Sequence, residues 1–571
     1  MVIRTRVGMC TLAALALVLS GCGKSEPPPA SEQSESPRRG GTFRMAQDSP
    51  GSLDPASVDD VYEATIVNQV FDGLLSFDNQ LNTVPCIASS WIISPDGNVY
   101  TFHLRQDLRF HDGSTLTSAD VVHSLTRIFD LPIEESSLAR EYLCHIAGSG
   151  AYQAGKAASI RGLEALDPNT VRITLEHPYA SFLAVLASEL SRIVPKAYVE
   201  RVGDAAFAQR PIGSGPFRLA AWEPGHRIVL TAFEDYKPAT VLLDSIVFEI
   251  PVQSARDRAV AGFMAGHLSA CVVPDGRLAE FKRLPRTSVL TRQELSTTFV
   301  GLNPTRAPFG DVRVRQAFAL AVDRAAILAG GNAARIQPNG ILPPGMPGYT
   351  PESKLLEHDP ARARALLAAA GYPGGKGLPS IVYTTASQTE EADRLNRLIS
   401  QQLAAVGFHI TLQKMEWLDF SRHLDQKDLQ CFNVTWVADI PDPDSFLNPL
   451  CHSTGGANFA CYTSAEVDAL LLTGRNMRSA TARVDVYRDA ERRVLQDAAL
   501  VPLFHPLSAV AIQENVRDLH ITAMGFGNMA LENVWLADGP PPSQVARAAA
   551  ASPNNVRGPG AAPRPLEGRV P

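Results

Sequence analysis

Apolar and polar residues alternate in many short segments of this chain, and segments with helical spacing lie between them. Alternation with a period of two predicts strands over residues 42–47, 99–105, 170–176, 227–233, 245–250 and 408–413. Apolar residues at helical spacing predict helices over residues 62–75, 121–129, 182–190, 312–329, 360–370 and 392–406. Because strands and helices alternate along the whole chain, we predict an α/β fold.

Two local signals mark turns and caps within this pattern. Residues 107–113 continue the strand at 99–105 into an Asp112–Gly113 turn, which is a strong hairpin signal. Thr117 to Asp120 precedes the helix over 121–129 and supplies capping side chains. The pattern contains no internal repeat.

The N-terminus carries an export signal. Arg4 and Arg6 form a basic region, and Val7 to Leu19 is an apolar stretch too short to span a bilayer. Leu19-Ser20-Gly21-Cys22 then follows the lipobox pattern, so we predict that residues 1–22 are a lipoprotein signal peptide and that Cys22 is lipidated. An ordinary secretory signal with an incidental cysteine is the alternative, and either interpretation predicts export.

The ends of the mature chain differ in composition from its middle. Residues 23–40 are rich in Pro, Ser and Glu, and we interpret them as a flexible tether. Residues 539–571 are rich in Ala, Pro and Gly, and we interpret them as a disordered tail. The body between them is long enough for two or three domains.

Charge argues against nucleic acid as a partner. The chain has a formal net charge of −7, and removal of Arg4 and Arg6 with the signal gives −7 − 2 = −9 for the mature chain. A mildly acidic protein without long basic runs is not typical of nucleic-acid binding. No stretch after Cys22 approaches the roughly 20 apolar residues that a transmembrane helix needs.

The cysteines that remain in the mature body can form disulfides in an oxidising compartment. Cys451 and Cys461 flank a short, Gly-rich segment, and we predict a disulfide between them. A zinc site is the rival interpretation, but neither cysteine belongs to a CxxC pair. Sequence does not pair the others, which are Cys86, Cys144, Cys271 and Cys431.

Catalytic motifs are absent from the sequence. It contains no His-Glu-x-x-His, no Gly-x-Ser-x-Gly and no phosphate-binding loop. The acidic segment, residues 439–444, lacks the glycine and the final Glu of a calcium-binding loop. We therefore expect a protein that is not an enzyme, has no metal centre and needs no cofactor.

A series of motifs in the body points to one family. They are Gly40–Arg44, Ser52–Pro55, Phe71–Leu74, Phe110–Val121, Ile212–Phe217, Gly301–Pro304, Pro308–Phe318, Ala369–Pro373 and Trp436–Phe446. In this order they cover nearly the whole body, and the chain resembles the family-5 extracellular solute-binding proteins of peptide-type ABC importers. The chain departs from the family at Ala270, where an acidic residue is common.

The resemblance implies a two-lobed clamp, similar to periplasmic binding proteins, with an extra domain inserted in the first lobe. By this analogy the first lobe comprises residues 41–71, 196–295 and 507–538. The inserted domain comprises residues 72–195, and the second lobe comprises residues 296–506. Such a clamp closes over its ligand, and ligand binding shifts the equilibrium between open and closed states.

The resemblance also implies ligand-binding residues. Asp439, three residues after Trp436, is at the position whose carboxylate pairs with a peptide's α-ammonium, and Thr435, Trp436 and Val437 form the strand that lies along the peptide. The remaining expected contacts are Trp417, which lines a side-chain pocket, and Asp59 and Val61 from the opposite lobe.

The C-terminal anchor for the peptide is less clear from the resemblance. Some family members hold the ligand's carboxylate with arginines, but this chain has Leu424 and Asn433 at those positions. Arg422 and His423 lie nearby as alternatives. Peptide length is therefore left open.

The resemblance implies a lipid-anchored peptide-binding subunit, facing the periplasm or the extracellular side, whose partners are an ABC permease and its ATPase. The same clamp can hold a nickel chelate, haem, an opine or an oligosaccharide, or can act in a sensor lipoprotein. An exported peptidase is a more distant alternative. Gly23 after the lipidated cysteine leaves the choice between inner and outer membrane open.

Overall fold

The computed structural model describes residues 36–58, 60–250, 255–274, 276–330, 335–351, 357–386 and 389–537. The described residues from Arg38 onward form one compact unit. Cys22, the signal peptide, most of the tether, Asp59 and the C-terminal tail lie outside the described residues.

An N-terminal sheet has the strand order β1-β10-β9-β8. Its strands are β1 (Thr42–Ala46), β8 (Phe217–Glu223), β9 (Arg227–Ala232) and β10 (Ser245–Glu249). β1 pairs in parallel with β10, and the other pairs are antiparallel. Alternate residues of β1, such as Phe43 and Met45, are buried in a core that also contains Phe217 and Phe248.

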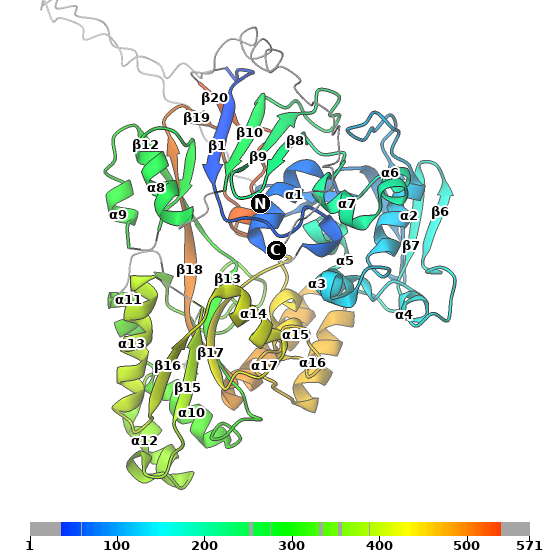
Figure 1. Ribbon diagram of the computed structural model, residues 1–571. Helices are drawn as coiled ribbons and strands as arrows, with labels where there is room; N and C mark the ends of the chain where they lie inside the picture. Colours follow the sequence, from blue (N-terminus) through cyan, green and yellow to red (C-terminus); the bar gives the residue numbers. More distant parts are fainter. Residues whose placement is uncertain are drawn as a thin grey trace, which may run out of the picture. The chain divides into compact units, whose positions relative to one another are not determined.

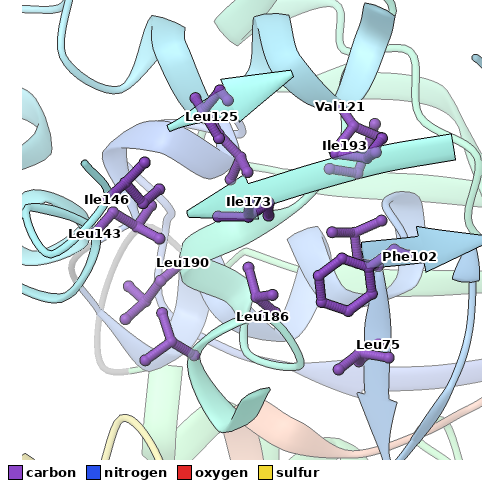
Figure 2. Close-up of a cluster of buried hydrophobic side chains, with 14 of the residues drawn as sticks. Leu75, Phe102, Val121, Leu125, Leu143, Ile146, Ile173, Leu186, Leu190 and Ile193 are labelled. Atoms are coloured by element: carbon purple, nitrogen blue, oxygen red, sulfur yellow. The ribbon is translucent and has the colours of Figure 1, made fainter. Parts of the chain in front are cut away.

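A small sheet with the order β4-β5-β7-β6 is entirely antiparallel. Its strands are β4 (Ala88–Ile93), β5 (Val99–Leu104), β6 (Leu163–Asp167) and β7 (Thr170–Thr174). The side chains of Phe102 and Ile173 point from this sheet into a buried cluster, which we call the small-sheet core (Figure 2). Helix residues such as Val121 and Leu143 complete that core.

A large mixed sheet contains eight strands, and its principal path is β11-β18-β13-β17-β15-β16. Its members are β11 (Ala270–Val272), β12 (Thr287–Gln293), β13 (Ser296–Leu302), β14 (Arg335–Ile336), β15 (Ile381–Thr385), β16 (Ile410–Lys414), β17 (Cys431–Val437) and β18 (Leu500–Gln513).

The long strand β18 joins two parts of the large sheet (Figure 1). Its first half, up to Phe504, pairs with β13, and its second half, from Leu507, pairs with β12. Pro506 lies between the two halves and pairs with β14. A strand that connects two packed regions can act as a hinge between them.

Short strands and helices complete the structure. The remaining strands are β2 (Leu75–Phe77), β3 (Thr83–Pro85), β19 (Val516–Arg517) and β20 (Trp535–Leu536). The α-helices of the first half are α1 (Val61–Val70), α2 (Ser118–Arg127), α3 (Ile133–Leu143), α4 (Ser149–Gln153), α5 (Phe182–Val185), α6 (Lys196–Val202), α7 (Asp204–Gln209), α8 (Ala255–Met264) and α9 (Leu278–Phe281). Those of the second half are α10 (Val312–Ala321), α11 (Arg324–Gly330), α12 (Pro360–Ala369), α13 (Glu390–Ala404), α14 (Trp417–Asp425), α15 (Asp444–Cys451), α16 (Ala465–Asn476) and α17 (Ala480–Asp497). The 3-10 turns are η1 (Pro55–Ser57), η2 (Glu189–Ser191), η3 (Pro373–Gly375) and η4 (Phe526–Asn528).

The predicted strands and helices are present, but some predicted helices were too long. The segment 312–329 is two helices, because Val322 is extended and Asp323 accepts a hydrogen bond from the N–H of Ala326 at 3.0 Å, so a new helix begins. The segment 182–190 is likewise interrupted at Ser188, which is extended and caps η2. The predicted continuation of β5 through residues 107–113 is reduced to an isolated bridge between Arg109 and Thr115.

The first helix also ends earlier than predicted, because the backbone is extended at Phe71, and two glycines lie against its last residue. α1 stops at Val70, whose carbonyl accepts a hydrogen bond from the N–H of Gly215 at 2.9 Å. A Cβ atom at Gly213 would lie 2.0 Å from the same carbonyl oxygen. Only glycine permits this approach of two backbones, which accounts for the glycines in the motif Ile212–Phe217.

The predicted disulfide is absent from the structure, because Cys451 and Cys461 are both free thiols. Cys451 ends α15 and is fully buried in an apolar core. The sulfur of Cys461 instead lies 3.6 Å from the carbonyl oxygen of Lys427 and 3.6 Å from the side-chain nitrogen of Asn303. Proximity in sequence was therefore a poor guide to the direction of the Cys461 side chain.

Candidate functional site

The acidic segment, residues 439–444, follows β17 directly and leads into α15. Trp436 and Asp439 are held together by Ser445 in the first turn of α15. The indole nitrogen of Trp436 donates to the carbonyl of Ser445 at 2.7 Å, and the N–H of Asp439 donates to the Ser445 hydroxyl at 2.8 Å. The strand, the carboxylate and the helix start therefore form one connected local structure.

The side chain of Asp439 is contacted by a residue far away in sequence. The hydroxyl of Tyr142, on α3, donates to Oδ2 of Asp439 at 2.7 Å, and the Ser445 hydroxyl donates to the same atom at 3.4 Å. Tyr142 is 1% exposed. Nothing in the sequence pattern predicted this contact, because the two residues are separated by 297 positions.

Burial, together with the charges of Glu189 and Glu141, raises the pKa of the Asp439 carboxyl to about 7. The hydrogen bonds from Tyr142 and Ser445 oppose this shift. No ion pair among the described residues includes Asp439. Its carboxylate is thus desolvated, surrounded by hydroxyl donors and without a cationic partner.

Asp444, at the other end of the acidic segment, has an entirely different environment. The guanidinium of Arg475 lies 3.0 Å from the Oδ2 atom of Asp444. The hydroxyl of Tyr487 donates to Oδ1 at 2.7 Å, and that of Tyr179 donates to Oδ2 at 2.9 Å. Burial acts to raise the pKa of Asp444, but the guanidinium of Arg475 brings this pKa below its ordinary value. Asp442 similarly binds the guanidinium of Arg483, with an Nη1–Oδ2 distance of 2.6 Å.

These contacts join the acidic segment to the region of the small sheet. Besides Tyr142 and Tyr179, Ser181 accepts a hydrogen bond from Arg483 at 2.9 Å. Ile440 is fully buried within the small-sheet core. Polar and apolar contacts therefore both hold the acidic segment against the elements around α3.

The strand predicted to bind ligand has an unpaired edge. β17 pairs with β13 along its whole length, but it pairs with β15 only through Cys431 and Phe432. Residues 433–437 have no strand partner on that side within the described part of the chain. Thr435 is exposed, and its hydroxyl lies 2.7 Å from that of Thr298; Val437 is partly exposed.

The structure does not link every predicted site residue to Asp439. Trp417 begins α14 and is 58% exposed, with the ring of Phe420 at a centroid distance of 6.0 Å. Val61 begins α1 and is 36% exposed. No hydrogen bond among the described residues joins either of them to Asp439, and Asp59 lies outside the described part.

The nearby candidates for a C-terminal anchor are already engaged with acidic side chains. Arg422 lies 3.0 Å from Asp419, and His423 lies 2.9 Å from Asp428. Within the described ranges, no cluster of His, Cys, Asp or Glu is arranged to hold a metal ion. The described helices also include none that is long and apolar enough to cross a membrane.

Comparison with known proteins agrees with the resemblance. The profile described as "Bacterial extracellular solute-binding proteins, family 5 Middle" matches residues 82–458. Heme-binding protein A of Haemophilus influenzae is 30% identical over 543 residues, which cover 90% of this chain and 97% of that protein. The periplasmic oligopeptide-binding protein OppA of Salmonella typhimurium is 29% identical over 482 residues, or 80% of this chain and 86% of that protein.

Solved structures confirm the predicted clamp. The ABC transporter-associated periplasmic binding protein DppA from Helicobacter pylori, in complex with peptide STSA, has a TM-score of 0.77 and 26% identity, covering 88% of this chain and 99% of that one. These relatives are two-lobed α/β binding proteins and not enzymes, as predicted. The chain belongs to the bacterial extracellular solute-binding proteins of family 5.

Proposed function

We propose that this protein captures short peptides with a free amino terminus and that Asp439 pairs with the peptide's α-ammonium group. The observation that carries the proposal is the environment of Asp439, a desolvated carboxylate with hydroxyl donors and no cation. An ammonium group would replace the lost hydration and supply the missing opposite charge. Neighbouring Asp444 already forms an ion pair with Arg475, so its charge is neutralised without a ligand.

The unpaired edge of β17 supports the same proposal. A peptide placed along residues 433–437 would form main-chain hydrogen bonds that do not depend on its side chains. Its amino end would then lie near Asp439, which directly follows the strand. Main-chain pairing with one charged anchor is a suitable arrangement for binding peptides of varied sequence.

The division into domains is also a proposal. We assign residues 41–71, 196–295 and 507–538 to the first lobe, residues 72–195 to the inserted domain and residues 296–506 to the second lobe. The separate buried cores support this assignment, since the small-sheet core draws almost wholly on the inserted segment. β18 would then carry the chain from the second lobe to the first.

The peptide proposal is tested by a double-mutant cycle. Asp439→Asn keeps the side-chain shape and removes the charge, so affinity for Ala-Ala-Ala should fall by about two decades or more, at ~1.4 kcal/mol per decade. N-acetyl-Ala-Ala-Ala should bind weakly to both proteins. Calorimetry on the four combinations would contradict the proposal if the losses from acetylation and substitution were additive.

Haem is the main rival ligand, because the relative Heme-binding protein A matches almost the full length of this chain. Native mass spectrometry of protein purified from rich medium separates the two. Co-purified short peptides are the expected result. Bound haem, a metal chelate or a sugar would replace the peptide proposal with that ligand.

We also propose that Cys22 anchors the protein to the membrane and that the captured peptide is delivered to an ABC permease. Cys22→Ala should leave the body folded while membrane association is lost, since the tether separates the anchor from the core. Membrane fractions washed with carbonate report the result. Retention of the variant in the membrane would contradict the lipid anchor.

A further inference from the structure

A second buried carboxylate near the proposed site has one oxygen atom without a hydrogen-bond partner. Glu189, in η2, is 8% exposed, and its Oε2 atom is buried without a partner. No ion pair among the described residues includes Glu189. An unsatisfied buried carboxylate oxygen is costly, so its presence in a native structure requires an explanation.

Glu189 lies in a turn that packs against α3, the helix that contacts Asp439, and its charge acts on Asp439. Leu190 and Ile440, the residues that follow these two acids in sequence, are both buried in the small-sheet core. α3 packs against η2, and α3 carries Tyr142, whose hydroxyl donates to Asp439 at 2.7 Å. Figure 2 shows Leu143 of α3 and Leu190 of η2 in the same cluster.

The cation that acts on Glu189 is Arg192, which lowers the pKa of Glu189 but forms no ion pair with it among the described residues. The Nη2 atom of Arg192 donates to the side-chain oxygen of Asn68 at 2.6 Å, so this guanidinium is directed at Asn68. The charge of Glu189 contributes to the raised pKa of Asp439, and Glu141 adds to it. Burial also raises the pKa of Glu189 itself. Like-charged carboxylates in a desolvated space favour the entry of positive charge.

We propose that Glu189 is a specificity residue that binds a second cationic group of the ligand, the side chain of a lysine-like first residue, while Asp439 binds the α-ammonium. This inference rests on the proposed function and names its preferred ligand class. A peptide with an N-terminal lysine, ornithine or diaminobutyrate carries both positive charges at one end. Such a ligand would satisfy both carboxylates at once.

The test compares dipeptides that differ in one charged group. Lys-Ala, ornithine-Ala, diaminobutyrate-Ala and norleucine-Ala are titrated calorimetrically into the full chain at pH 7.5. At least one cationic peptide should bind about tenfold or more tightly than norleucine-Ala, the uncharged analogue of lysine, because a buried charge is costly without its partner. The length of the preferred side chain indicates the spacing of the two carboxylates.

Variants then locate the effect. In Glu189→Gln, the best-bound cationic dipeptide should have about the same affinity as norleucine-Ala, so the ratio of the two affinities should be about one. The pH midpoint of norleucine-Ala binding should also move downward, because the variant removes a like charge that acts on Asp439. Glu200→Gln, which removes an exposed carboxylate on α6, is the matched control and should change neither quantity.

The outcomes distinguish this inference from the proposal beneath it. If none of the dipeptides, including norleucine-Ala, binds the wild type, the peptide function itself fails. If norleucine-Ala binds as tightly as every cationic dipeptide, only the role of Glu189 is overturned. The wild-type series gives this answer even if Glu189→Gln does not fold. A ratio unchanged in a folded Glu189→Gln also overturns the inference.

Discussion

Asp439 and Asp444 lie in one short acidic segment, and the surrounding structure gives them opposite properties. Asp444 is fully buried with Arg475 and tyrosine hydroxyls, and its pKa is lowered. Asp439 is partly exposed as a residue, but burial desolvates its carboxyl group, which has hydroxyl donors on its Oδ2 atom and a pKa raised to about 7. The comparison teaches that an acidic residue is identified as a ligand site by the lack of a partner and not by its charge alone. A carboxylate with a complete set of partners supports the fold, and one without a cation is available to a ligand.

The largest expected difference is in stability. Asp444→Asn leaves the mostly buried guanidinium of Arg475 without its charge partner, so the free energy of unfolding should fall by about 3–5 kcal/mol. Asp439→Asn should be at least as stable as the wild type at pH 7.5, because it removes a desolvated charge that has no cation. Thermal and denaturant melting of both variants measures this difference. A similar loss of stability in both would show that Asp439 is structural.

The pH dependence of peptide binding should differ in the same way. Asp439 must be ionised to pair with an ammonium, so affinity for Ala-Ala-Ala should fall as pH falls below about 7, by about tenfold per pH unit. Asp444, with its lowered pKa, stays ionised in this range and contributes no such change. Calorimetry at pH 5.5, 6.5 and 7.5 tests the difference. Affinity that is constant over this range would contradict the raised pKa or the role of Asp439.

The smallest effects come from single hydroxyl groups. Tyr142→Phe removes the donor that lowers the pKa of Asp439, so the midpoint of the binding profile should move upward and affinity at pH 6.5 should fall a few-fold. Tyr179→Phe, the matched variant beside Asp444, should leave that midpoint unchanged and cost about 1.5–3 kcal/mol of stability. If both variants shifted the midpoint equally, the two carboxylates would not be independent.

Much of the fold could be predicted from sequence because its signals are local. Alternation identified strands such as β5 and β7, and helical spacing identified α12 and α13. Helix ends were predicted less well. α10 and α11 were predicted as one helix because the apolar spacing continues across Val322, where the backbone is extended. The Asp323 side chain, which caps the next helix, was the overlooked signal.

The site could be predicted only in part. Trp436 and Asp439 were identified from a motif on one continuous segment, and Ser445, which binds both, lies in the same segment. Tyr142 and Glu189 were missed because they come from the region of the small sheet, far away in the chain. The free thiols of Cys451 and Cys461 were missed for a related reason, since side-chain direction is set by packing around Lys427 and Asn303.

The sequence by itself determined the family, the alternation of strands and helices, and the presence of a carboxylate after the Trp436 strand, because each of these is written in neighbouring residues. Only the tertiary structure decided which carboxylate is neutralised and which is left for a ligand. A pKa depends on every charge and dipole within several ångströms. For Asp439 and Asp444 these groups include Tyr142 and Tyr179, which are 297 and 265 positions away and are brought near only by folding.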